Sequence, residues 1–187
     1  MRVFVALDIP GEVRARISEV SAKLACACPQ ARWARVEGLH VTLKFIGEAT
    51  PEKVERIRAA LATVRSATPV EMNFRSVGFF PNERHPRVFW IGIEATPNLA
   101  ELGAGIEQRL ETLGIPREPR PFRPHLTLAR FRSEDGLERL REEVHSLGAL
   151  EFGATRTNEL YLYQSRLEPG GAEYTRLAKF DFIRGAR

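Results

Sequence analysis

The sequence predicts an α+β fold of two pseudo-symmetric lobes, each an antiparallel sheet with helices packed outside, facing across a central cleft. Strand-like and helix-like segments alternate along the 187 residues, in the same order in both halves of the chain. A short His-x-Thr motif occurs once in each half, at His40 and at His125. Such self-similarity is typical of an internal duplication. We therefore expect a single bilobal domain over 1–187, with duplicated halves of approximately 1–95 and 96–187.

The first half alternates between two hydrophobic patterns. Stretches rich in β-branched and aromatic residues predict strands, and apolar residues at helical spacing predict helices with one buried face. Thr50 followed by Pro51 is typical of a helix start, because the threonine can cap free amides and proline fits the first turn. In chain order we expect a strand over 2–8, a helix from Pro10, an ambiguous segment over 32–36, a strand over 40–47, a helix from Pro51, and strands over 70–80 and 88–94 joined by a turn at Pro81-Asn82.

The second half repeats this order. Thr96-Pro97 and Ser133 are predicted helix caps, and Gly114 is a predicted helix end. The helix after each His-x-Thr strand has the same apolar spacing, at positions 54, 57, 61 and 64 and at positions 137, 140, 144 and 147. The expected elements are a helix over 97–113, a Pro-rich and Arg-rich link over 116–124, a strand over 125–131, a helix after Ser133, one or two strands over 150–164, a turn at 169–171, and a strand over 174–183.

The composition is that of an ordinary globular protein with a mild basic excess. The formal net charge is +4, which suits an anionic ligand without demanding one. Cys26 and Cys28 are too close in sequence for an ordinary disulfide, so we expect a reducing, cytoplasmic compartment. No stretch is long enough for a transmembrane helix, and no signal-peptide cleavage pattern follows the first strand. We expect no membrane partner and a monomeric chain.

The two His-x-Thr motifs carry the predicted chemistry. Alternate residues of a strand share a face, so His40 points with Thr42, and His125 points with Thr127. Two histidines can act as base and acid near neutral pH. Threonine hydroxyls can donate hydrogen bonds to phosphate oxygens. This set predicts phosphoryl chemistry, with no cofactor and no metal, since no Cys, Asp or Glu lies near either motif at ligand spacing.

The sequence around these motifs resembles a known family. The motifs HVTL at 40–43 and HLTL at 125–128 resemble those of the 2H phosphoesterase superfamily. Within it, the chain is similar to the RNA 2′,3′-cyclic phosphodiesterase family, also called the 2′-5′ RNA ligase family. The resemblance covers nearly the whole chain and includes the stretches RVFVALDIP, LHVTLKFIGE, GFFPNERHPRVFWIG and RPFRPHLTLARF.

The resemblance implies hydrolysis of a 2′,3′-cyclic phosphate to a 2′-phosphomonoester, with the 3′ oxygen as leaving group. It assigns the acid to His40 and the base to His125, and the near-symmetry leaves the reverse open. It implies that Thr42 and Thr127 hold the phosphate. The expected partner is RNA ending in a 2′,3′-cyclic phosphate, or a cyclic nucleotide. Joining of RNA ends through a 2′-5′ bond is an implied secondary activity.

Phe45 and Arg130 are candidate base-binding residues. Each lies five positions after a motif histidine, and the resemblance implies that the two side chains sandwich a base. An odd spacing in a regular strand points away from the histidine face, so this role needs a bulge or a strand end. Without one, Phe45 is a core residue and Arg130 a surface residue.

Three other functions are open from the sequence. A module could bind RNA ends without cutting them, although pure binding requires neither an acid nor a base. Another 2H activity could cleave 2′-5′ oligoadenylate or a small cyclic nucleotide with the same motifs. A metallohydrolase would lose activity in the presence of a chelator.

Overall fold

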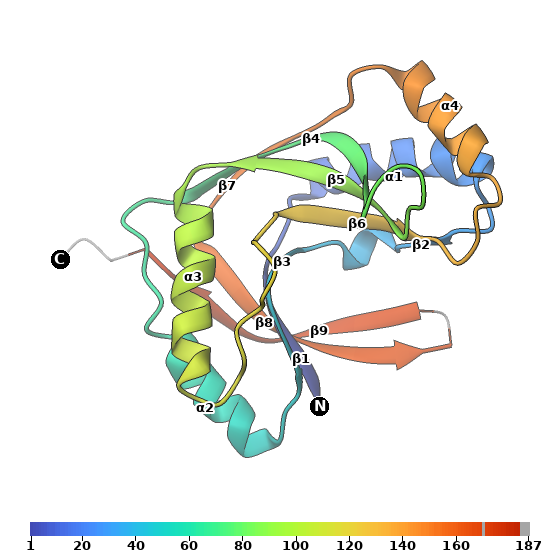
Figure 1. The fold of residues 1–187 in the computed structure, drawn as a ribbon. Helices are drawn as coiled ribbons and strands as arrows, with labels where there is room; N and C mark the ends of the chain where they lie inside the picture. The colour runs from blue at the N-terminus through green and yellow to red at the C-terminus, as the bar shows by residue number, and fades with distance from the viewer. Residues whose placement is uncertain (170, 184–187) are drawn as a thin grey trace.

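The computed structural model describes residues 1–169 and 171–183. These residues form four α-helices, one 3-10 turn and two antiparallel sheets, as the sequence predicts for an α+β protein (Figure 1). The elements are β1 (Arg2–Leu7), α1 (Gly11–Ala27), β2 (Arg32–Trp33), η1 (Val36–Gly38), β3 (Val41–Glu48), α2 (Pro51–Leu61), β4 (Val70–Phe80), β5 (Val88–Ala95), α3 (Asn98–Glu111), β6 (His125–Arg130), α4 (Leu137–Leu147), β7 (Glu151–Thr157), β8 (Glu159–Glu168) and β9 (Gly171–Asp181).

Each sheet takes strands from both halves of the chain. The first sheet has the order β3-β1-β8-β9, and the second has the order β2-β6-β5-β4-β7. The His-x-Thr strands are β3 and β6, so each sheet carries one motif. α2 packs against α3 and α1 packs against α4, as two separate pairs of helices (Figure 1). The two sheets therefore do not coincide with the chain halves 1–95 and 96–187, and the duplication of those halves stays a prediction.

The start of α2 is confirmed, but two other predicted caps are wrong. The Thr50 side chain accepts a hydrogen bond from the Lys53 amide (3.2 Å). By contrast, α4 begins only at Leu137, because Gly136 directly before it adopts a left-handed φ of 77° and the Ser133 hydroxyl bonds a neighbouring carboxylate. α3 begins without a side-chain cap, since the hydroxyl of the preceding threonine bonds the side chain of the first helical residue.

Other boundaries shift by a few residues. α3 ends at Glu111, before the predicted stop at Gly114. Val144 and Leu147 of α4 are only partly buried, unlike the earlier apolar residues of that helix. The predicted turn at 169–171 includes residue 170, which lies outside the described residues.

No helix in the described part of the chain is both long and apolar enough to cross a membrane.

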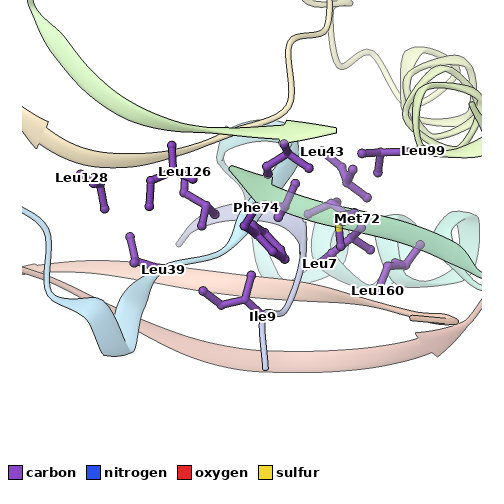
Figure 2. Close-up of a cluster of buried hydrophobic side chains, with 14 of the residues drawn as sticks. Leu7, Ile9, Leu39, Leu43, Met72, Phe74, Leu99, Leu126, Leu128 and Leu160 are labelled. Carbon is purple, nitrogen blue, oxygen red and sulfur yellow. The ribbon is translucent and has the colours of Figure 1, made fainter. Parts of the chain in front are cut away.

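One hydrophobic core joins both sheets and all four helices. Figure 2 shows Leu43 of β3, Leu126 of β6 and Leu99 of α3 in the same cluster. A second, smaller cluster of Phe4, Ala6, Tyr161 and Tyr163 is formed by the opposite face of the first sheet. The core thus occupies one face of each motif strand, which leaves the other face available for the site.

Candidate active site

His40 and Thr42 lie on the face of β3 that points away from the main core. Val41 and Leu43 are buried in that core, whereas Thr42 is only partly buried and pairs with Ala6 of the smaller cluster. The ring centroid of His40 lies 4.5 Å from that of Phe4, another member of this cluster. The alternation predicted from the sequence is therefore confirmed at the first motif.

A β-bulge brings Phe45 to the same face. Thr42 pairs with Ala6 and Lys44 pairs with Val5, so Leu43 is an extra residue in β3. The bulge shifts the alternation by one position, and Phe45 then pairs with Phe4. The Phe4 ring lies 6.0 Å from the Phe45 ring and also contacts His40. The odd spacing between His40 and Phe45 is thereby reconciled with a shared face.

The second motif contains the same irregularity at the equivalent position. Thr127 pairs with Trp90 and Ala129 pairs with Phe89, so Leu128 is the extra residue in β6. Arg130 pairs with Val88, which lies on the same face of β5 as Trp90. In both motifs the bulge falls on the third residue after the histidine. Arg130 is exposed and lies on the His125 face of its sheet.

The two imidazoles are held in the same way. His40 Nδ1 lies 2.7 Å from the carbonyl oxygen of Gly38, and His125 Nδ1 lies 2.7 Å from that of Arg123. A carbonyl oxygen can only accept a hydrogen bond, so Nδ1 carries the proton in both rings. This tautomer leaves each Nε2 as the nitrogen available for proton transfer.

The surroundings of the two histidines differ. Tyr174 meets His40 edge-on at 5.0 Å, and Tyr163 lies 6.0 Å from it in a stacked orientation. Burial lowers the pKa of His40 below its ordinary value and Arg14 adds to this effect, while the bond to Gly38 and the charge of Asp8 oppose it. This partly buried imidazole therefore favours its neutral form.

On the second sheet, the aromatic contact of His125 comes from Phe80. The two rings meet edge-on at 5.1 Å, and Phe80 in turn lies 5.0 Å from Trp90. β3 and β6, which belong to different sheets, contact one another. The strands that carry the two motifs are therefore neighbours across the junction of the sheets.

The threonine hydroxyls are free to meet a ligand. Thr42 and Thr127 are both partly exposed. Within the described residues, neither hydroxyl takes part in a side-chain hydrogen bond, so each can donate to an oxygen of a bound molecule.

Similarity to known proteins identifies the family of the chain. A sequence model described as LigT like Phosphoesterase matches the chain twice, over residues 7–90 and 91–174. The chain belongs to this family. One motif histidine lies in each matched segment.

Two relatives and one solved structure each match almost the whole chain. A protein of Methanothermobacter thermautotrophicus named RNA 2′,3′-cyclic phosphodiesterase is 33% identical, over 96% of this chain and 98% of its own. One of the same name from Thermus thermophilus is 36% identical, over 99% of this chain and 91% of its own. The crystal structure of E. coli LigT complexed with 3′-AMP is 28% identical, covers 97% of both chains and has a TM-score of 0.79.

The buried position of Lys44, next to the first motif, is not predicted by the sequence. The bulge turns its side chain toward the helices, where it is 5% exposed. Its Nζ donates to Glu107 Oε2 (2.6 Å) on α3 and to the carbonyl oxygen of Pro116 (2.6 Å). Lys44 thus ties the first motif strand to the start of the segment 116–124 that leads to His125. Strand alternation alone would place this lysine beside Thr42, so no sequence signal indicated its burial.

The sequence also does not predict a small pocket that lies beside His40. It has a volume of about 140 Å³ and is lined by Asp8, Arg14, Glu37, Gly38, Leu39, His40, Tyr163, Tyr174 and Arg176. These residues come from α1, η1, β8 and β9, from the end of β1 and from the two positions before β3, so no local pattern could have indicated them. Among the described residues, no three His, Cys, Asp or Glu side chains gather in a way that could hold a metal ion.

Proposed function

We propose that this protein hydrolyses 2′,3′-cyclic phosphates at RNA ends to 2′-phosphomonoesters, with His40 and His125 as the acid–base pair and without a metal. The observation that carries the proposal is the matched pair of imidazoles, each bound through Nδ1 to a carbonyl two residues earlier. Each ring therefore offers Nε2 on a face that it shares with a free threonine hydroxyl. The names of the full-length relatives support the substrate.

The proposed reaction is an in-line displacement at phosphorus. One neutral imidazole accepts a proton from water while the water oxygen bonds to phosphorus. The bond from phosphorus to the 3′ oxygen breaks, and the other imidazole, in its protonated form, gives its proton to that oxygen. Each of these proton transfers is typically worth ~10²–10⁴-fold in rate. Thr42 and Thr127 donate hydrogen bonds to the non-bridging oxygens, where negative charge is greatest.

The proposal includes a base-binding pair. Phe45 is 63% exposed, an unusual state for a phenylalanine, and lies on the His40 face of the first sheet. Arg130 lies on the His125 face of the second sheet. An aromatic ring and a guanidinium plane can hold a nucleobase between them with little preference for its identity.

The roles of the two histidines are open to a direct test. Family resemblance gives the acid to His40, whereas its lowered pKa favours the neutral form that a base needs. A cyclic phosphate with sulfur in place of the 3′ oxygen has a leaving group that needs no acid. The alanine variant of the acid should regain turnover on this substrate, and the alanine variant of the base should not.

Loss of the same 3′ oxygen explains the proposed secondary activity, the joining of RNA ends through a 2′-5′ bond. If a 5′-hydroxyl replaces water as the nucleophile, loss of the 3′ oxygen leaves a 2′-5′ phosphodiester bond. The monomeric state stays a prediction. Both cysteines are free thiols, which suits a reducing compartment such as the cytoplasm.

Turnover of an RNA with a 2′,3′-cyclic phosphate end, followed with EDTA present, tests the proposal. A metal-independent enzyme retains its full rate, and a metallohydrolase loses it. A purified protein that binds the RNA end without cutting it would instead be the binding module. Turnover confined to 2′-5′ oligoadenylate or to small cyclic nucleotides would indicate another 2H activity.

A further inference from the structure

The two matched motifs differ at the residue that lies beside each histidine. Leu7 pairs with Val41, so Asp8 lies next to His40 at the end of the β1–β3 ladder. In the second sheet, the corresponding pair is Gly92 and His125. One histidine therefore has a carboxylate beside it, and the other has a glycine.

The second sheet has no room for an equivalent carboxylate. A Cβ atom on Gly92 would lie 2.9 Å from the carbonyl oxygen of Arg75 and 2.9 Å from Ser76 Oγ. Contacts this short force a shift of the backbone of β4, so the position excludes a side chain. The difference between the two sheets is thus built into their packing.

Asp8 binds two arginines, and the first of these reaches the turn before His40. Arg14 Nη2 donates to Asp8 Oδ1 (2.5 Å). Arg14 Nη1 donates to the carbonyl oxygens of Val36 (2.7 Å) and Glu37 (2.8 Å). The next carbonyl along the chain is that of Gly38, which accepts the hydrogen bond from His40 Nδ1. Arg14 therefore fixes the turn that holds the imidazole.

The second arginine reaches the aromatic side chains around His40. Arg176 Nη2 donates to the other oxygen of Asp8, and its Nε donates to the Tyr163 hydroxyl (3.1 Å). Tyr163 and Tyr174 both lie against the His40 ring. The side chains of Asp8 and Arg14 are 28% and 22% exposed, and their charged atoms bond mainly to the protein itself. Because these charged atoms already have hydrogen-bond partners within the protein, a positioning role is favoured over the capture of a ligand.

We propose that Asp8, Arg14 and Arg176 form a positioning network that fixes the orientation and tautomer of His40 and so sets it apart from His125. The proposal deepens the proposed function and rests on it for the effect on rate. The network itself can be tested without turnover, because the ionisation of each histidine can be followed directly.

Asp8 and Arg14 carry opposite charges, so removing one or the other should shift the pKa of His40 in opposite directions. The groups that face it are Asp8 after β1, Arg14 on α1, Glu37 in η1, Tyr163 on β8, and Tyr174 and Arg176 on β9. Loss of the Arg14 charge should raise the pKa of His40, since a nearby cation disfavours the imidazolium. Loss of the Asp8 charge should lower it further, since a nearby anion favours the imidazolium.

The experiment is a nuclear magnetic resonance titration of the four histidine rings in the full chain, using Asp8→Asn, Arg14→Met and Arg14→Lys. His125 is the internal reference for the site, and ¹⁵N shifts report the tautomer of each ring. Arg16→Met is the matched control, because Arg16 lies on the same helix and, among the residues that the structure describes, pairs only with the exposed Glu19. Arg14→Lys keeps the charge but loses the paired bonds to two carbonyls.

We expect His40 to titrate higher in Arg14→Met and lower in Asp8→Asn, with His125 unmoved. In Arg14→Lys, the His40 tautomer should become mixed while its titration point changes little. Where the wild type turns over cyclic phosphate, Arg14→Met should lower kcat on the order of 10²-fold, as for a displaced reacting group, with KM little changed. An unchanged titration midpoint of His40 in Arg14→Met and Asp8→Asn, or an equal change in the signal of His125, would overturn the proposed network. A wild type without turnover would contradict the proposed function and leave the titration result standing.

Discussion

Replacing Phe45 with alanine should weaken substrate binding and leave the fold intact. The ring is 63% exposed, so its removal deletes little buried area from the folded protein. Stacking of a base on an aromatic ring is worth about 1–3 kcal/mol. At about 1.4 kcal/mol for each factor of ten, KM should rise roughly 5- to 150-fold, while kcat stays unchanged because the proposed role of the ring is to stack on the base and not to act on the reacting phosphate.

The assay compares two substrates by steady-state kinetics. One is a 2′,3′-cyclic nucleotide, and the other is a ribose 2′,3′-cyclic phosphate that carries no base. Phe45→Ala should raise KM only for the nucleotide, since the second substrate has nothing to stack. Phe122→Ala, which removes another exposed phenylalanine, is the matched control and should affect neither substrate. Equal losses on both substrates, or an unchanged KM for the nucleotide, would refute the stacking role.

Three further predictions follow from the site. His40→Ala and His125→Ala should each lower kcat by ~10²–10⁴-fold with unchanged circular dichroism, and near-normal turnover in either variant would contradict the mechanism. Lys44→Met should lower the free energy of unfolding by about 3 kcal/mol, because it leaves Glu107 without its partner in a largely buried pair. The control is Arg58→Met, which breaks an exposed pair. If Lys44→Met lowers the free energy of unfolding no more than this control does, the buried contact is not stabilising. Because the pKa of His40 is lowered in the folded protein, the unfolded chain binds the extra proton first as the pH falls below about 6.5. Stability should therefore decrease as the pH falls from that value through the pKa of folded His40, and the decrease should be smaller in His40→Ala.

The fold and the centre of the site follow from local sequence patterns. Alternation in short strands places Val41 and Leu126 in the core, and it therefore places His40 and His125 on the opposite faces. Period-two and helical patterns report which face of an element is buried, and this is sufficient to locate a motif on a strand. The helix start at Thr50 follows from side-chain chemistry that is equally local.

The parts that could not be predicted depend on contacts between distant segments. The bulges at Leu43 and Leu128 follow from pairing with β1 and β5, and they reverse the faces of Lys44 and Phe45 relative to simple alternation. The Asp8 network joins α1, η1 and β9 across more than a hundred residues of chain. The predicted cap at Ser133 fails for a different, local reason, because its hydroxyl bonds the carboxylate of Asp135 and not the helix end.

Turnover of an RNA with a 2′,3′-cyclic phosphate end in EDTA, with identification of the product isomer, tests the proposed mechanism most directly. The mechanism predicts a metal-independent reaction that yields a 2′-phosphate and that nearly disappears in both His40→Ala and His125→Ala. A 3′-phosphate product, a rate abolished by EDTA, or no turnover by the wild type would contradict it.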